Sequence, residues 1–177
     1  RARVLEATLE LAADSGLQAC TFDAVAERSG VARSTLYRHW SNQAELVMEA
    51  IDGQEVERVA PDTGNLRDDM LSAMLELGRG LDDSLWGAMV PQLVAAAYID
   101  PEMSDIQRRN AEYHQSIDVE IVERAKGRGE IPADTDSAHA ALLFVAPIFY
   151  RKVNARQPID ARWISAHVDK TVALLRR

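Results

Sequence analysis

Apolar residues recur at a spacing close to 3.6 residues along nearly the whole of this chain, and this spacing is the repeat of an α-helix. Most glycines and prolines fall between the periodic segments, where they separate one helix from the next. With 177 residues, of which 47% are hydrophobic, the chain can bury a core in one domain or two small ones. The sequence therefore predicts an all-α protein.

Local signals for helix starts and stops divide the first third of the chain. Gly16 and Gly30 follow periodic segments and can adopt the left-handed backbone that closes a helix. Thr21 precedes another periodic segment as an N-cap. We expect a first helix that ends at Ser15 and a second that extends from Thr21 to Ser29. A very short helix follows over residues 33–39 and a longer one over residues 43–59.

The remaining chain begins at a predicted boundary in Pro61-Asp62-Thr63-Gly64. Asn65 caps a helix with one apolar face, formed by Leu66, Met70, Ala73, Met74, Leu77 and Leu81. A long helix opens at Asp100-Pro101 and runs to about Lys126, and further helices are expected over residues 138–150 and 160–176. We therefore predict two domains, over residues 1–60 and 65–177.

The last two predicted helices carry more apolar surface than packing within a single chain requires. The helix over residues 138–150 is apolar apart from His139. The final helix carries two apolar stripes, one of Ala161, Ile164, Val168, Val172 and Leu175 and the other of Trp163 and Leu174. This pattern favours a homodimer in which two helices of each subunit pack on their counterparts. The alternative is that both stripes are interior to a single chain.

Several classes of protein are disfavoured by composition. No run of 18 apolar residues is present, so we expect no membrane segment and a cytoplasmic protein. The single cysteine, Cys20, cannot form an internal disulfide and is interpreted as a small buried hydrophobic residue. His114, His139 and His167 fall on separate predicted helices without the spacing of metal ligands. We therefore expect no metal, no cofactor and no catalytic residues.

The formal net charge is −8, yet residues 28–39 contain three arginines, a histidine and no acidic side chain. Within this stretch and just before it, Ala26, Gly30 and Leu36 have the spacing of a helix-turn-helix. That motif needs a small residue where two helices cross, a glycine in the turn and an apolar anchor on the second helix. A seven-residue helix is too short to be stable alone, so its function is to present side chains from a scaffold.

Helical spacing then turns Leu36 and Trp40 inward and the cationic side chains outward. Arg33 is the candidate for guanine readout, with Ser34 and Thr35 for short contacts to bases. Tyr37, His39 and Thr21 would bind phosphates, and Arg38 could do either. The alternative for each residue taken singly is an ordinary solvated side chain. A carboxylate in this stretch would lie against the phosphates of a DNA duplex.

The segment "TFDAVAERSGVARSTLYRHWSNQAEL" closely resembles the DNA-binding segment of the tetracycline-repressor (TetR) family. The resemblance implies an N-terminal three-helix helix-turn-helix domain and a C-terminal helical domain for ligand binding and dimerisation. It also implies a non-enzymatic homodimer that represses transcription from a palindromic operator and is released by a small-molecule inducer. Two residues depart from the family pattern. Ala32 replaces a capping serine, at a cost of about 1 kcal/mol, and Gln43 replaces a phosphate-binding lysine.

If the resemblance holds, large, soft or polar residues on inward stripes could line an inducer cavity. They are Met70, Met74, Trp86, Met89, Asn110, Tyr113 and Phe144. Asn110 is the most informative of them because a polar group on an apolar face needs a partner. The alternative is that these residues belong to the core. Rival functions are a helical enzyme or small-molecule carrier with an incidental helix-turn-helix, and a transcriptional activator.

Overall fold

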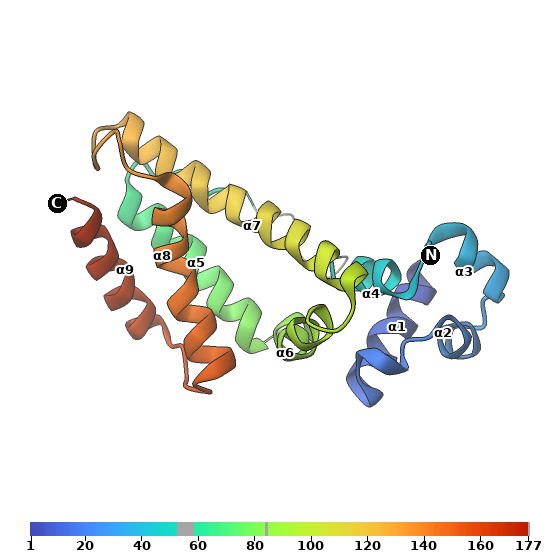
Figure 1. Cartoon of the computed structure of the whole chain (residues 1–177). Coiled ribbons are helices and arrows are strands. Elements are labelled where there is room, and N and C mark those ends of the chain that lie inside the picture. Colours follow the sequence, from blue (N-terminus) through green and yellow to red (C-terminus); the bar gives the residue numbers. More distant parts are fainter. Residues whose placement is uncertain (53–58, 84, 177) are drawn as a thin grey trace. The chain divides into compact units, whose positions relative to one another are not determined.

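The computed structural model describes residues 1–52, 59–83 and 85–176, which form helices joined by turns (Figure 1). No strand occurs in these ranges, and the prediction of an all-α fold is confirmed. Internal contacts divide the chain into two compact units. Unit 1 contains the described residues 1–52 and 85–109, and unit 2 contains the described residues 59–83 and 110–176.

Unit 1 is built around the N-terminal helices. Its elements are α1 (Ala2–Ser15), the 3-10 turn η1 (Leu17–Ala19), α2 (Phe22–Ser29), α3 (Arg33–His39), α4 (Gln43–Asp52), α6 (Leu85–Ala97) and the start of α7 (Pro101–Gly127). Both predicted helix ends are confirmed. Gly30 adopts the predicted left-handed backbone, with φ 67° and ψ 19°, whereas Gly16 has a positive φ of 83° but an extended ψ of 168°. The Thr21 hydroxyl accepts the Ala24 N–H at 3.2 Å, so Thr21 is the N-cap of α2.

The fourth helix differs from its predicted length. The structure describes α4 as far as Asp52, and the predicted continuation over residues 53–58 lies outside the described residues. Val59, the predicted last residue of this helix, is not helical. Pro61 lies shortly after it and disfavours helical backbone in the residue that precedes the proline.

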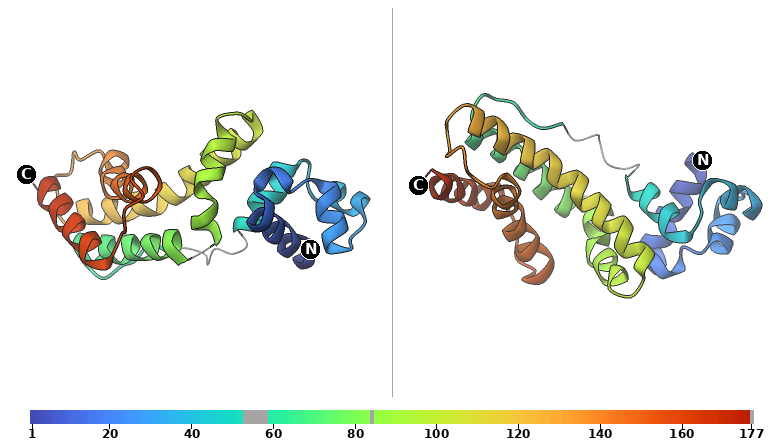
Figure 2. Two further views of the ribbon diagram at one scale, coloured as in Figure 1. Left: turned by 90° about the horizontal axis from the view of Figure 1, so that it is seen from below. Right: turned by 45° about the horizontal axis from the view of Figure 1, so that its top comes forward.

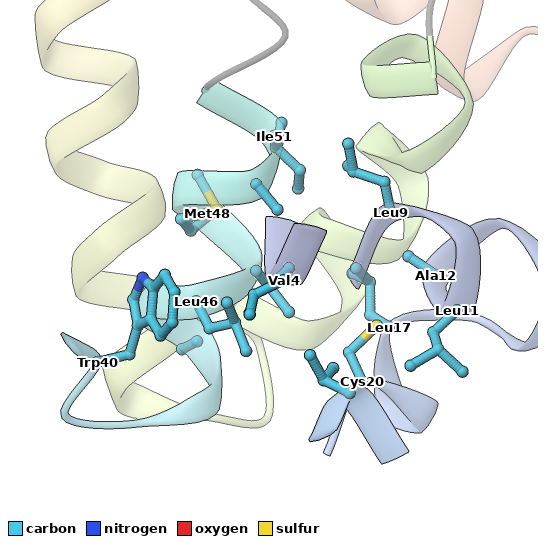
Figure 3. Close-up of a cluster of buried hydrophobic side chains, with 14 of the residues drawn as sticks. Val4, Leu9, Leu11, Ala12, Leu17, Cys20, Trp40, Leu46, Met48 and Ile51 are labelled. Atoms are coloured by element: carbon cyan, nitrogen blue, oxygen red, sulfur yellow. The ribbon is translucent and has the colours of Figure 1, made fainter. Parts of the chain in front are cut away.

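The core of unit 1 forms where α1 packs against α2, α4 and α6 (Figure 3). It includes Val4 and Ala12 of α1 and Leu46 of α4, each at most 2% exposed. Cys20 is fully buried in this core, as predicted, and burial raises the pKa of its thiol to about 11. The thiol therefore stays protonated at neutral pH and behaves as a small hydrophobic group.

Unit 2 is a bundle of longer helices. It consists of α5 (Leu66–Asp83), the rest of α7, α8 (Ser137–Phe149), the π-helical turn η2 (Tyr150–Asn154) and α9 (Ala161–Leu175). The predicted apolar face of α5 is buried along its whole length. Helix α5 packs on α8 and α9, which run beside each other (Figure 2). At Gly78 a β-carbon would come within 2.7 Å of the Ile164 Cδ1 atom, so glycine permits the close approach of α5 and α9.

A polar network holds the start of α5 against the loop between α7 and α8. The Glu130 carboxylate accepts the Leu66 N–H at 2.9 Å and an Arg128 Nε–H at 2.7 Å. The other side of the Arg128 guanidinium lies 3.3 Å from Asp69, whose side chain is fully buried. Asp69 also accepts the Thr63 hydroxyl at 2.7 Å. A carboxylate distant in sequence thus caps α5, alongside the predicted local cap Asn65.

Helices α8 and α9 bury one face each within unit 2 and leave large apolar side chains exposed. The first predicted stripe of α9 is buried at Ile164, Val168 and Val172. At the ends of this stripe, Ala161 is exposed and Leu175 is half-buried. Trp163 of the second stripe is also half-buried. The large apolar side chains of α8, η2 and α9 that remain exposed are Leu142, Tyr150 and Leu174, at 49%, 66% and 55%. This surface lacks a partner from within the described part of unit 2.

Candidate nucleic-acid interface

Helices α2 and α3 form the predicted helix-turn-helix. Gly30 occupies the turn in left-handed backbone conformation, and Ala26 is partly buried against the core. Leu36 is 0% exposed and Trp40, directly after α3, is 2% exposed. Ala32 is the N-cap of α3 and makes no side-chain hydrogen bond, as its replacement of serine implied. The short helix is therefore held by its buried anchors and not by a cap.

The side chains predicted to contact DNA fall into two groups by exposure. Thr21, Arg33, Ser34, Tyr37, Arg38 and His39 are exposed, whereas Thr35 and Gln43 are half-buried. The inward orientation of Leu36 and the outward orientation of Arg33 and Arg38 follow from the helical repeat. Trp40 follows α3 in extended backbone and packs in the core of unit 1. Their individual roles toward DNA stay predictions.

Arg33 lies in a cluster that includes an acidic residue from the preceding helix. Its Nη1 atom is 2.5 Å from the Asp23 carboxylate, and its Nη2–H donates to the Tyr37 hydroxyl at 2.8 Å. The guanidinium also lies 5.3 Å from the centroid of the Tyr37 ring. Sequence reasoning missed Asp23, because an acid in the first turn of a helix is ordinarily explained by the helix dipole.

Gln43 is engaged within unit 1. Its side-chain amide donates to the Leu17 carbonyl at 3.1 Å, while the Leu17 N–H donates to the side chain of Gln92 at 3.1 Å. Both backbone polar groups of Leu17 are therefore bound by glutamines, one from α4 and one from α6. A lysine at position 43 could donate to the same carbonyl, but the neutral amide adds no charge toward phosphates.

Glu49 of α4 fixes the end of the recognition helix α3. Its carboxylate accepts the indole N–H of the buried Trp40 at 2.9 Å and forms two hydrogen bonds with Arg1, at 2.6 and 2.7 Å. The hydrogen bond from Arg1, followed by that from Trp40, holds the pKa of Glu49 below its ordinary value despite partial burial. Glu49 therefore connects α1, α4 and the residue that ends α3.

Replacing Glu49 with alanine is expected to destabilise unit 1 by about 1–3 kcal/mol at pH 7, because the buried Trp40 N–H loses its acceptor. A lowered folded-state pKa means that ionised Glu49 stabilises the fold above its unfolded-state pKa. This contribution disappears as the pH falls through the folded-state value. The difference in free energy of unfolding between Glu49→Ala and the wild type should therefore become smaller below about pH 4. Urea unfolding of both proteins at pH 7 and at pH 3 measures this difference.

The matched control for this prediction is Glu6→Ala, which removes an exposed carboxylate from α1. Its free energy of unfolding should change little at either pH. A Glu49→Ala protein that is as stable as this control at pH 7 would contradict the assigned role of Glu49.

The residues predicted to line an inducer cavity do not all fall in one unit. Met70, Met74 and Phe144 are fully buried in unit 2, where Asn110 is half-buried and Tyr113 is 51% exposed. Met89 is buried in the core of unit 1 together with α1 and α4. Trp86 lies on α6, but its side chain is outside the part of the chain that the structure describes.

A helix-turn-helix with its anchors buried and its cations exposed, in a chain whose described residues form helices joined by turns, has the arrangement of a DNA-binding transcriptional regulator. Within the described ranges, no helix has the length and apolar character to cross a membrane. The sequence pattern of bacterial regulatory proteins of the tetR family matches residues 4–50. The pattern of the tetracyclin repressor-like C-terminal domain matches residues 60–171. The chain belongs to the TetR family of transcriptional regulators.

Individual relatives agree with this assignment. The DNA-binding transcriptional repressor TetR of Mycobacteroides abscessus is 31% identical over 99% of this chain and 93% of its own length. An uncharacterised HTH-type transcriptional regulator of Bacillus subtilis, YdeS, is 29% identical over 84% of this chain and 75% of its own. The crystal structure of the TetR family transcription regulator SCO0332 superposes with a TM-score of 0.76 at 26% identity. That match covers 98% of this chain and 96% of the other.

Proposed function

We propose that this regulator is a homodimeric, ligand-responsive repressor that acts in the cytoplasm and binds a palindromic operator. The observation that carries the proposal is the orientation of α3, with Leu36 at 0% exposure and Arg33 and Arg38 on the outside. This is the arrangement that places a recognition helix in a major groove with its cations toward DNA. The relative from Mycobacteroides abscessus, named as a transcriptional repressor, supports repression over activation.

The exposed apolar surface of α8 and α9 supports the homodimer. Leu142, Tyr150 and Leu174 are each about half exposed or more, and large exposed apolar side chains on elements that pack together favour an interface. Two copies related by a two-fold axis would cover the same surface on each other. The two helix-turn-helix segments of the dimer would then meet successive major grooves.

We assign DNA binding to residues 1–60 and ligand binding and dimerisation to residues 65–177. The buried side chains of Met70, Met74 and Phe144 provide the soft apolar surroundings that small-molecule sites use, and the half-buried Asn110 of α7 offers a polar group. An inducer that prefers the DNA-free conformation by about 1–3 kcal/mol would lower the affinity for the operator about five- to 150-fold. Relatives are named as regulators, and we propose no enzymatic activity.

Selection of bound duplexes from a random pool tests this function. We expect enrichment of an inverted repeat whose half-sites are about 34–36 Å apart, because two recognition helices of a dimer must reach one face of the duplex. Affinity should fall steeply with salt. Catalytic turnover or ligand binding without salt-sensitive affinity for any duplex would instead favour an enzyme or a carrier.

Replacing Arg33 with alanine is expected to relax base preference at one position of each half-site by about five- to 150-fold, because a guanidinium fork that reads guanine is lost. Tyr37→Phe is the matched comparison, since it keeps the ring that contacts Phe22 and removes only the hydroxyl. We expect it to weaken binding to all duplexes and to change base preference far less than Arg33→Ala does, because the guanidinium itself remains and loses only one of its two partners. Gel-shift titrations against the operator and its single-base variants measure both effects. An Arg33→Ala protein with unchanged base preference would contradict guanine readout.

A further inference from the structure

The side chain assigned to base readout is already engaged by two partners in the protein alone. Asp23 lies 2.5 Å from one terminal nitrogen of Arg33, and Tyr37 accepts a hydrogen bond from the other at 2.8 Å. The remaining N–H groups of the guanidinium fork stay available for another acceptor. The Arg33 and Asp23 side chains are 54% and 65% exposed, so the pair lies at the surface that would face DNA.

Tyr37 is itself held in place. Its ring meets the ring of Phe22 edge to face, with centroids 4.6 Å apart and planes at 82°. Phe22 is 7% exposed and belongs to the core of unit 1. Asp23 is its neighbour in the sequence, in the first turn of α2. Arg33 is therefore positioned by two side chains, one that contacts the buried Phe22 ring and one that follows Phe22 in the sequence.

The Asp23 carboxylate affects two modes of DNA binding differently: sequence-independent binding to phosphates and readout of a guanine edge. Sequence-independent binding depends on the charge of lysine and arginine against phosphates. Asp23 neutralises the charge of Arg33 and repels phosphates, so it weakens that mode. Guanine readout depends instead on a correctly oriented fork of N–H donors. An arginine that is already oriented loses less side-chain freedom on binding, so Asp23 does not weaken this mode in the same way.

We propose that Asp23 is a specificity-determining residue of the DNA-binding surface, whose carboxylate orients Arg33 for a guanine edge and disfavours its contact with phosphates of unrelated sequence. The inference rests on the proposed DNA-binding function and adds a residue outside the recognition helix. The competing explanation is an ordinary surface ion pair, whose removal would leave the preference for one sequence over another unchanged.

The test compares Asp23→Asn with the wild-type protein, using the selected operator and an unrelated duplex of equal length. We expect Asp23→Asn to bind the unrelated duplex about three- to tenfold more tightly and the operator within about twofold of wild type. The ratio of the two affinities should therefore fall by about three- to tenfold. For the unrelated duplex, the slope of log K against the logarithm of the salt concentration should become steeper by about one, because Arg33 gains a phosphate contact.

Two matched proteins separate this effect from a general loss of negative charge. Glu27→Gln removes an exposed carboxylate from the same helix, and its affinity ratio should stay at the wild-type value. In an Arg33→Ala background, Asp23→Asn should no longer change the ratio, because the arginine that it orients is absent. Asp23→Ser serves as a second variant at the same position, with the same expected result as Asp23→Asn.

The Asp23 inference is overturned if Asp23→Asn changes both affinities equally, if Glu27→Gln lowers the ratio as much, or if the effect persists without Arg33. These results would leave the proposed function intact, since the wild type would still select an operator. A wild-type chain that selects no sequence overturns the proposed function and this inference with it.

Discussion

Truncating Leu36 to alanine is expected to remove about 2–5 kcal/mol from the free energy of unfolding of unit 1 and to abolish operator binding. Leu36 is 0% exposed and is the buried residue of a seven-residue helix. The N-cap of α3, Ala32, makes no side-chain hydrogen bond. Without a cap, and with its one remaining anchor, Trp40, beyond its last residue, so short a helix is not expected to persist, because its nucleation cost is not recovered by internal hydrogen bonds.

Hydrogen exchange of the amides in α1 to α4, together with operator affinity, measures this result. The amides of unit 2 provide an internal reference, since they should keep their wild-type protection. Leu36→Met is the matched control, because it keeps the volume of the side chain and should cost less than about 1.5 kcal/mol. Retention of operator affinity in Leu36→Ala would show that α3 is held by other contacts.

Replacing Arg128 with methionine is expected to destabilise unit 2 by about 3 kcal/mol, because Asp69 would be left as a buried carboxylate without its cation. The Asp69 side chain is 0% exposed, and Arg128 lies 3.3 Å from it. The value falls at the low end of the range for a broken buried ion pair, since Thr63 still donates its hydroxyl hydrogen to Asp69 at 2.7 Å. Arg128→Met also removes a donor from Glu130, the distant cap of α5.

Thermal unfolding followed by circular dichroism measures this change. Arg67→Met is the matched control, because Arg67 forms ion pairs with Asp68 and Asp169 in which each side chain is more than a third exposed. Water screens such pairs, so the control should leave the free energy of unfolding nearly unchanged. Equal losses of stability in the two variants would contradict the prediction, because the burial of Asp69 would then add nothing to the cost of removing Arg128.

Several parts of the fold could be predicted because they depend on residues close in sequence. Gly30 adopts the left-handed backbone that ends α2, and Thr21 caps the start of that helix, as their residue types indicate. Leu36 points into the core because the helical repeat turns it away from the outward arginines, and Trp40, which follows α3 in extended backbone, is buried as predicted. The all-helical fold and the helix-turn-helix followed from such local rules.

Other features depend on which helices meet, and local rules do not determine that. The burial of Met89 in the core of unit 1, and not beside Met70 and Met74, reflects the packing of α6 on α1. Gln43 matched a family position for phosphate contact, yet its amide bonds to the Leu17 carbonyl. A side chain with several possible partners is assigned one only when the surrounding helices are in place.

The sequence by itself determined most of the helices, their local caps and the outward face of α3, because turn glycines, capping hydroxyls and a 3.6-residue repeat act within a few residues. It did not predict α6. Only the tertiary structure decided that Asp23 meets Arg33 and that Glu130 caps α5 from 64 residues away. The physical reason is that the energy of an ion pair or a distant cap depends on separation in space. Packing of whole helices sets that separation.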